Sequence, residues 1–204
     1  MLREWIYPKI ERPLKSAAEQ LHKNGLASNQ LKACSLVLNL VAACLLLNGK
    51  FIFGGIIILA AWLSDLFSEI LAKEPYEATP FGSFLGSFTD CYSEFFLYSG
   101  LALHFAREQQ AIYLWLSLGI LAGACAVNYS KARAQYFTEN CIAGIFDRRL
   151  RIVILMAGTL IPPLLPLMLW ILCIGSHATA LQQLFNTKKQ LTGGTEEQAE
   201  SSTE

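Results

Sequence analysis

The stretch that decides the fold runs from Asp65 to Glu94 and reads DLFSEILAKEPYEATPFGSFLGSFTDCYSE. It joins the end of one strongly apolar segment to the next. Asp65 and Glu69 lie one helical turn apart, as do Asp90 and Glu94, so each pair shares one face of a helix. Charged side chains inside a lipid bilayer are costly and usually mark a functional site. The sequence therefore predicts two neighbouring membrane helices that carry a polar site.

The composition of the whole chain favours a membrane protein. Of its 204 residues, 53% are hydrophobic and only 16% are charged, which is too apolar for an ordinary soluble domain. The formal net charge is zero, and there is no basic excess that would indicate nucleic acid as a partner. The six cysteines form no C-x-x-C pair, so we expect reduced packing residues instead of disulfides or metal ligands.

Hydropathy predicts an all-α membrane bundle with six transmembrane helices. The first four spans are expected at 31–47, 51–72, 81–105 and 111–127. The apolar run from Ile152 to about Leu184 is too long for one span of roughly 20 residues. Pro162, Pro163 and Pro166 divide this run, which predicts two helices with a turn between them. The alternative is one kinked helix and five spans.

The chain divides into three predicted regions. Residues 1–30 mix aromatic, aliphatic and basic side chains, which indicates a short interfacial helix after Pro13 or, alternatively, a plain soluble leader. Residues 31–187 form the six-helix transmembrane domain, and the polar residues 188–204 are expected to be a disordered cytoplasmic tail. With six spans, all lysines and arginines except Lys50 and Arg107 lie on one side, so both termini are predicted to be cytoplasmic.

The spacing of the central stretch resembles the signature of the CDP-alcohol phosphatidyltransferases, D-x2-D-G-x2-A-R-x8-G-x3-D-x3-D. Asp65 and Asp90 match its first and last acids. Ala72 matches the alanine, Gly82 matches the glycine, and Lys73 takes the place of the arginine. The spacing is kept without a gap.

Several positions depart from the family pattern. Ser68 replaces the second acid, Glu69 the glycine and Gly86 the third acid, so the signature is degenerate. Before the first span, the family usually has a Pro-Asn pair followed by a threonine. Here Ser28 stands in place of the proline and Lys32 in place of the threonine.

The resemblance implies a chemistry for the matched positions. In active members, the first three acids hold divalent cations against the pyrophosphate of a CDP-linked lipid, and the fourth takes a proton from the attacking alcohol. On this basis Asp65 is a metal ligand, Asp90 is the catalytic base, and Ala72, Lys73 and Gly82 contact the nucleotide. The cofactor is Mg²⁺ or Mn²⁺ if the chain is active, and otherwise there is none.

Glu69 and Glu94 have two interpretations each. Together with Asp65 and Asp90 they would complete a shifted four-carboxylate site, in which Glu69 and Glu94 are metal ligands. Alternatively, Glu69 pairs with Lys73 one turn along the helix. Glu94 is then a hydrogen-bonded polar group inside the bundle.

Two basic motifs extend the resemblance to the second half of the chain. The run NYSKARAQ at 128–135 is similar to S-Y-x-R-A-R-A-E in members that use inositol phosphate, and GIFDRRLR at 144–151 is similar to G-x-x-E-R-x-x-R. The resemblance implies binding of an anionic substrate or headgroup, which guanidinium groups suit. The residues concerned are Lys131, Arg133, Arg148 and Arg151. The alternative is ordinary positive charge at the ends of spans.

Three classes of function remain open from the sequence. The first is an enzyme of phospholipid biosynthesis that transfers a phosphatidyl group from CDP-diacylglycerol to an alcohol and releases CMP. The second is a catalytically inactive relative that binds a lipid, a nucleotide or a partner protein on the same scaffold. The third, a transporter or channel, has only the intramembrane acids in its favour. The resemblance also implies a homodimer embedded among membrane lipids.

Overall fold

The structure is a computed structural model that describes residues 20, 25–74, 79–137 and 146–201. Its described elements are the helices α2 (Ser28–Leu47), α3 (Phe51–Leu71), α4 (Pro80–Arg107), α5 (Ala111–Phe137), α6 (Arg148–Leu160) and α7 (Leu165–Ser201), with the 3-10 turn η1 (Pro162–Leu164). No strand occurs in the described part of the chain, which confirms the all-α prediction. The chain forms two compact units, Met1–Leu97 and Tyr98–Glu204, and α4 contributes to both.

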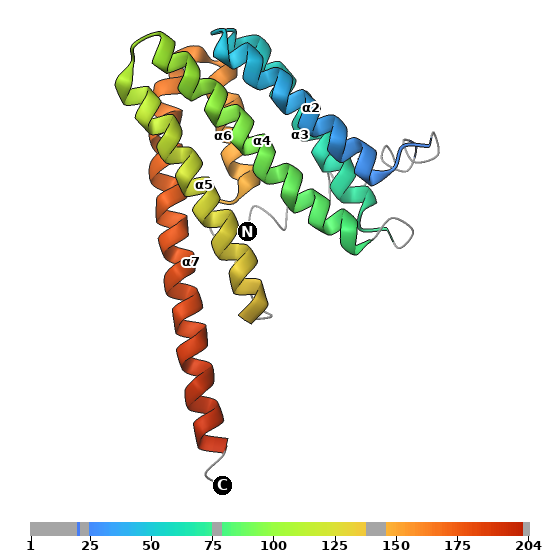
Figure 1. Cartoon of the computed structure of the whole chain (residues 1–204), viewed down its shortest axis with the longest axis vertical. Helices are drawn as coiled ribbons and strands as arrows, with labels where there is room; N and C mark the ends of the chain where they lie inside the picture. Colours follow the sequence, from blue (N-terminus) through green and yellow to red (C-terminus); the bar gives the residue numbers. More distant parts are fainter. Residues whose placement is uncertain (1–19, 21–24, 75–78, 138–145, 202–204) are drawn as a thin grey trace. The chain divides into compact units, whose positions relative to one another are not determined.

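In the first unit, α2 and α3 form a closely packed hairpin (Figure 1). The connection is Asn48-Gly49-Lys50, and Gly49 has a φ of 70°, a conformation that glycine adopts without steric cost. Gly54 on α3 lets the helices approach, because a Cβ there would lie 2.8 Å from Leu46 Cδ2. At the other end of the hairpin, Leu31 and Leu71 form a small apolar cluster. These contacts fix how the polar residues of α2 face those of α3.

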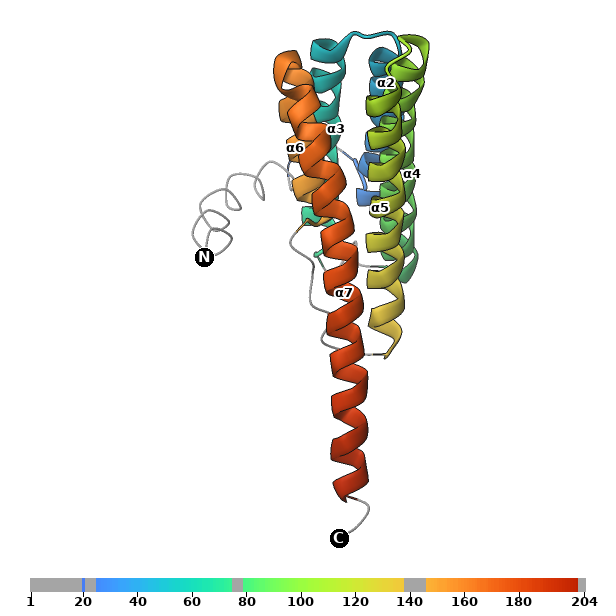
Figure 2. The same cartoon turned by 90° about the vertical axis from the view of Figure 1, so that its left-hand side faces the viewer.

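In the second unit, α7 packs against both α5 and α6 (Figure 2). Small residues allow this close packing. A Cβ at Gly123 would lie 2.8 Å from Ser176 Cβ, and one at Gly175 would lie 2.5 Å from the Phe146 ring. The unit is therefore held by tight packing of backbone against side chains.

Four helices are long and apolar enough to cross a membrane, namely Ser28–Leu47, Phe51–Leu71, Ala111–Ala134 and Pro162–Lys188. Outward side chains such as Phe53 and Trp115 are 64% and 70% exposed, which suits contact with lipid. The helix α4 covers the predicted third span but is not among the four. It carries Asp90 and Glu94 among several serines. An integral membrane protein is thus supported.

The proline-rich break lies where the sequence predicts it, because α6 and α7 are separate helices joined through η1. One kinked helix is therefore wrong. The helix α6 has 13 residues, about 20 Å in length, whereas a bilayer core is about 30 Å thick. Six spans accordingly remain a prediction.

Several predictions concern the ends of the chain and the cysteines. The interfacial helix expected within 1–30 lies almost wholly outside the described residues. The helix α7 continues to Ser201 and overlaps the predicted tail 188–204, whose boundary stays a prediction. The five cysteines within the described ranges form no disulfide with one another. Cys141 lies outside those ranges.

Candidate functional site

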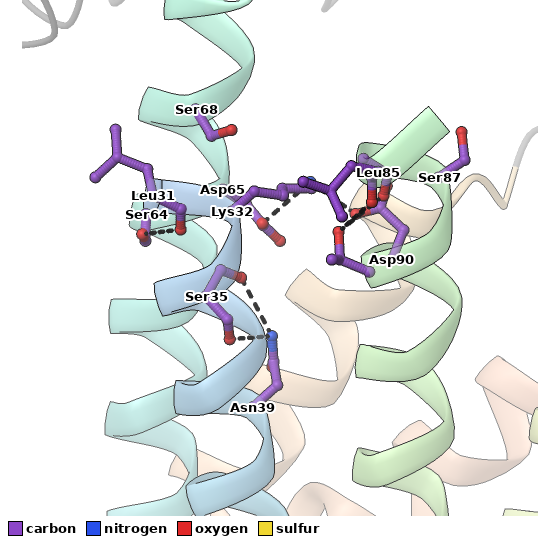
Figure 3. A network of polar contacts seen from close by, with 12 residues as sticks. Leu31, Lys32, Ser35, Asn39, Ser64, Asp65, Ser68, Leu85, Ser87 and Asp90 are labelled. Atoms are coloured by element: carbon purple, nitrogen blue, oxygen red, sulfur yellow. Dashed lines mark hydrogen bonds and ion pairs between the residues drawn. The ribbon is translucent and has the colours of Figure 1, made fainter. Parts of the chain in front are cut away.

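The two retained signature acids meet in the first unit, where Lys32 bridges them (Figure 3). Lys32 Nζ lies 3.1 Å from Asp65 Oδ1 and 2.7 Å from Asp90 Oδ1. The three residues belong to α2, α3 and α4, respectively. The side chains of Lys32 and Asp65 are 6% and 8% exposed, and that of Asp90 is 27% exposed. The structure thus brings the two acids together around a cation, and their catalytic and metal-binding roles stay predictions.

The electrostatics of this triad favour the bridge. Two carboxylates held close together repel each other, and burial removes the water that would otherwise solvate them. The ammonium group of Lys32 offsets one of the two negative charges and forms an ion pair with an oxygen of each acid. A buried charge is tolerated when it is paired in this way. Lys32 therefore reduces the repulsion between Asp65 and Asp90 and stabilises their close approach within the bundle.

One turn from the triad, Ser68 is used to join α3 to α2. Ser28 Oγ donates to Ser68 O at 3.0 Å, and Ser68 Oγ donates to Ser28 O at the same distance. Ser64 Oγ donates to Leu31 O at 2.8 Å. Both Ser28 and Ser68 are buried. The position of the second signature acid is thus occupied by a neutral hydroxyl that is engaged in helix packing.

The arrangement does not fit the divalent cations that the family resemblance implies. Gly86, at the position of the third acid, supplies no ligand, and a Cβ there would lie 3.8 Å from Lys32 Cε. The lysine side chain therefore runs through the space next to this position. In the described ranges, no group of three or more His, Cys, Asp or Glu side chains is placed to hold a metal ion. A divalent cation would instead meet two carboxylates that already pair with Lys32.

The two additional glutamates differ in their surroundings. Glu94 on α4 is buried, with 1% of its surface exposed, and Glu69 on α3 is half-buried. Neither joins Asp65 in a described metal-ligand group. Their predicted role as metal ligands stays a proposal without support from this geometry.

The predicted nucleotide contacts lie at the end of the site where α3 ends and α4 begins. Ala72 and Lys73 directly follow α3, and both are exposed. Gly82 in the first turn of α4 donates its N–H to Thr79 Oγ1 at 3.0 Å. A Cβ at Gly82 would lie 3.3 Å from Asn29 Oδ1. The glycine therefore permits a close approach between the first turns of α4 and α2.

The predicted anion-binding residues lie in the second unit and differ in how deeply they are buried. Arg151 is fully buried, and its guanidinium donates to Phe146 O at 2.9 Å and to Asn128 Oδ1 at 3.4 Å. Lys131 and Arg133 are exposed on α5, while Arg148 is half-buried at the start of α6. The burial of Arg151 favours a structural role for this residue over substrate binding.

The sequence analysis did not predict the place of Lys32 between the two acids. Lys32 was counted with the cations of the predicted cytoplasmic side, but it is only 5% exposed. Ser28, Lys32, Ser35 and Asn39 repeat at helical spacing and are all buried on α2. This polar stripe at the start of an apolar segment is the signal that would have indicated it.

No family model matches the chain. It is 28% identical over 190 residues to an archaetidylinositol phosphate synthase of Pyrococcus horikoshii, which covers 93% of this chain and 98% of that protein. It is also 28% identical over 156 residues to a phosphatidylinositol phosphate synthase of Streptomyces avermitilis, covering 70% and 64% of the two chains.

Solved structures share the fold. The Mycobacterium tuberculosis phosphatidylinositol phosphate synthase with CDP-DAG bound matches with a TM-score of 0.78 and 24% identity, covering 86% of this chain and 94% of that one. The same enzyme in complex with manganese and citrate matches with a TM-score of 0.78 and 23% identity. Together with the motifs around Asp65 and Asp90, these similarities support the resemblance of the chain to the CDP-alcohol phosphatidyltransferase family.

Proposed function

We propose that this membrane protein binds a CDP-linked lipid at the site formed by α2, α3 and α4 and does not transfer its phosphatidyl group. The observation that carries the proposal is the bridge from Lys32 to Asp65 and Asp90. It keeps the family's acids together but engages both of them. The chain would then act in phospholipid metabolism as a lipid- or nucleotide-binding relative of the enzymes.

Two features of the site oppose transfer. Positions 68 and 86 lack carboxylates, so the ligands that would hold divalent cations against a pyrophosphate are missing. Asp90, the predicted base, has its Oδ1 at 2.7 Å from Lys32 Nζ. The ion pair sets that oxygen against an ammonium group instead of the hydroxyl of an attacking alcohol.

Other features support binding. Lys32 lowers the negative charge of the two acids, and so lowers their repulsion of an approaching pyrophosphate. Lys73 is an exposed cation just beyond α3, at the position of the family's arginine. Ammonium groups are common phosphate ligands. The Mycobacterium tuberculosis relative of the same fold was crystallised with CDP-DAG bound.

The second candidate is an active phosphatidyltransferase, and the relatives favour it. The archaeal protein that matches over almost its whole length is called a synthase. In this case Glu69 and Glu94 would rebuild the metal site, and a divalent cation would displace Lys32 from the acids. Mg²⁺ or Mn²⁺ would then be required for turnover.

The proposal extends to the assembly and its orientation. We place both termini in the cytoplasm and propose a homodimer, with regions 1–30, 31–187 and 188–204 as interfacial segment, transmembrane domain and tail. Lys131 and Arg133, both exposed on α5, would contact an anionic headgroup. No nucleic acid is a partner in this proposal.

Binding is tested with CDP-diacylglycerol added to the detergent-solubilised protein in the presence of EDTA. We expect a concentration-dependent rise in the thermal unfolding temperature, and no rise with phosphatidic acid, which lacks the cytidine. Lys73→Glu should weaken binding about tenfold, because a charge-assisted hydrogen bond is replaced by repulsion. Lys50→Glu reverses an exposed charge at the other end of α3 and serves as the matched control.

Either of two results would contradict the proposal. One is the absence of stabilisation by CDP-diacylglycerol in folded protein. The other is stabilisation that appears only when Mn²⁺ replaces EDTA, which would indicate the metal-dependent site of an enzyme.

A further inference from the structure

Lys32 occupies a position in the site that cannot be explained as a surface charge. It emerges from α2 and reaches one acid on α3 and one on α4 (Figure 3). The two distances, 3.1 and 2.7 Å, are those of direct ion pairs. A single group with a positive charge thus connects three helices through two carboxylates.

The neighbouring substitutions are complementary to this lysine. Gly86 leaves room beside Lys32 Cε, at a point where the third signature acid would otherwise begin. Ser28 lies one turn before Lys32 and is bonded to Ser68, which stands in place of the second acid. Both positions that lack an acid therefore lie near Lys32, where a further carboxylate would add a negative charge that one ammonium could not balance.

We propose that Lys32 is a built-in cation that takes the structural place of the divalent ions at this site. Its ammonium group holds Asp65 and Asp90 together, so that the packing of α2, α3 and α4 needs no Mg²⁺ or Mn²⁺ and the site does not take up either ion. A tethered ammonium has no dissociation equilibrium with solution, whereas a bound ion does. The inference concerns the cation alone and holds whichever lipid the site binds.

The charge count supports exclusion of a divalent ion. A dication entering the triad would meet two carboxylates and one ammonium, and the ammonium would repel it at close range. Entry would require Lys32 to leave both carboxylates and to remain as an unpaired charge at a position that is only 5% exposed. Neither Ser68 nor Gly86 offers a carboxylate in compensation.

The wild-type protein alone provides a first test, without any lipid substrate. Purified protein is titrated with Mn²⁺ and bound Mn²⁺ is measured by electron paramagnetic resonance, with thermal unfolding followed in parallel. We expect no bound Mn²⁺ that depends on Asp65, and the same unfolding temperature in EDTA and in Mn²⁺. Bound Mn²⁺ that is lost in Asp65→Asn would overturn the inference.

A variant that carries the family's residues at three positions is expected to depend on Mn²⁺, unlike the wild-type protein. Lys32→Thr restores the family's threonine, and Ser68→Asp with Gly86→Asp restores its acids. We expect the triple variant to unfold roughly 10 °C lower than wild type in EDTA, because four carboxylates then lack a cation, and to regain most of this loss in Mn²⁺. Lys188→Thr, at an exposed position on α7, should behave as wild type in both conditions.

The results for the triple variant decide whether Lys32 takes the place of a metal ion. If the triple variant binds Mn²⁺ and wild type does not, Lys32 and the metal ions are alternatives at one site. If both bind Mn²⁺ equally, or if Lys32→Thr alone leaves the unfolding temperature unchanged in EDTA, the ammonium group is not the cation that holds the site. A triple variant that fails to fold in EDTA but folds in Mn²⁺ also supports the inference. One that folds in neither condition, despite intact wild-type behaviour, contradicts it.

Discussion

Lys32→Met is expected to destabilise the first unit by about 3–5 kcal/mol, the cost of removing one partner from a buried ion pair. Methionine keeps most of the volume of the side chain, so that the effect reports the lost charge and not a cavity. Asp65, whose residue is 5% exposed, would be left with a buried negative charge beside that of Asp90. Chemical unfolding in detergent micelles, followed by tryptophan fluorescence, measures the change.

The matched variants separate pairing from other effects. Lys188→Met alters an exposed lysine and should change the free energy of unfolding by less than about 0.5 kcal/mol. Adding Asp90→Asn to Lys32→Met should recover part of the loss, because one carboxylate is then neutral. If Lys32→Met costs no more than an exposed pair, about 1 kcal/mol or less, the bridge does not stabilise the site.

Arg151→Met is expected to destabilise the second unit by about 3 kcal/mol. The guanidinium is fully buried and donates to Phe146 O and Asn128 Oδ1, which both lose a donor in the variant. The neighbouring Arg149 is exposed, so Arg149→Met should leave the stability of the protein close to that of wild type. The same unfolding measurement serves for both variants.

The comparison of these two variants decides whether Arg151 of the basic motif has a structural role or binds an anion. If Arg151→Met and Arg149→Met are equally stable, Arg151 is not a structural residue, and its predicted role in anion binding regains support. A large difference would confirm that one arginine of the motif joins α6 to α5 through Asn128. The exposed Lys131 and Arg133 would then be the better candidates for an anionic headgroup.

The helices were predictable because local sequence features determine them. The span expected at 51–72 is α3 at Phe51–Leu71, and the turn before it contains Asn48 and Gly49, which favour chain reversal. The break near Pro162 was predictable because proline lacks the N–H that a continuing helix needs. Hydropathy alone could not decide whether α6 spans a membrane, since its 13 residues are part of a longer apolar run.

The centre of the site was only half predictable. Motif spacing identified Asp65 and Asp90, because that spacing resembles a known signature and requires no knowledge of neighbours. Lys32 looked like a basic residue at the start of a span, and its burial depends on contacts with residues far along the chain. The burial of Arg151 depends in the same way on a distant partner, Asn128 on α5, although its other partner, Phe146, lies just before α6.

CMP release from CDP-diacylglycerol by the purified wild-type protein decides whether the site of Lys32, Asp65 and Asp90 is catalytic. Mg²⁺ or Mn²⁺ is supplied with a panel of alcohols that includes inositol phosphate and glycerol phosphate. The Mycobacterium tuberculosis synthase is assayed alongside as a control, and a cooperative unfolding transition shows that the protein is folded. With Lys32 engaging both acids, we predict no CMP release above background with any acceptor. Metal-dependent release that is lost in Asp90→Asn would contradict this account.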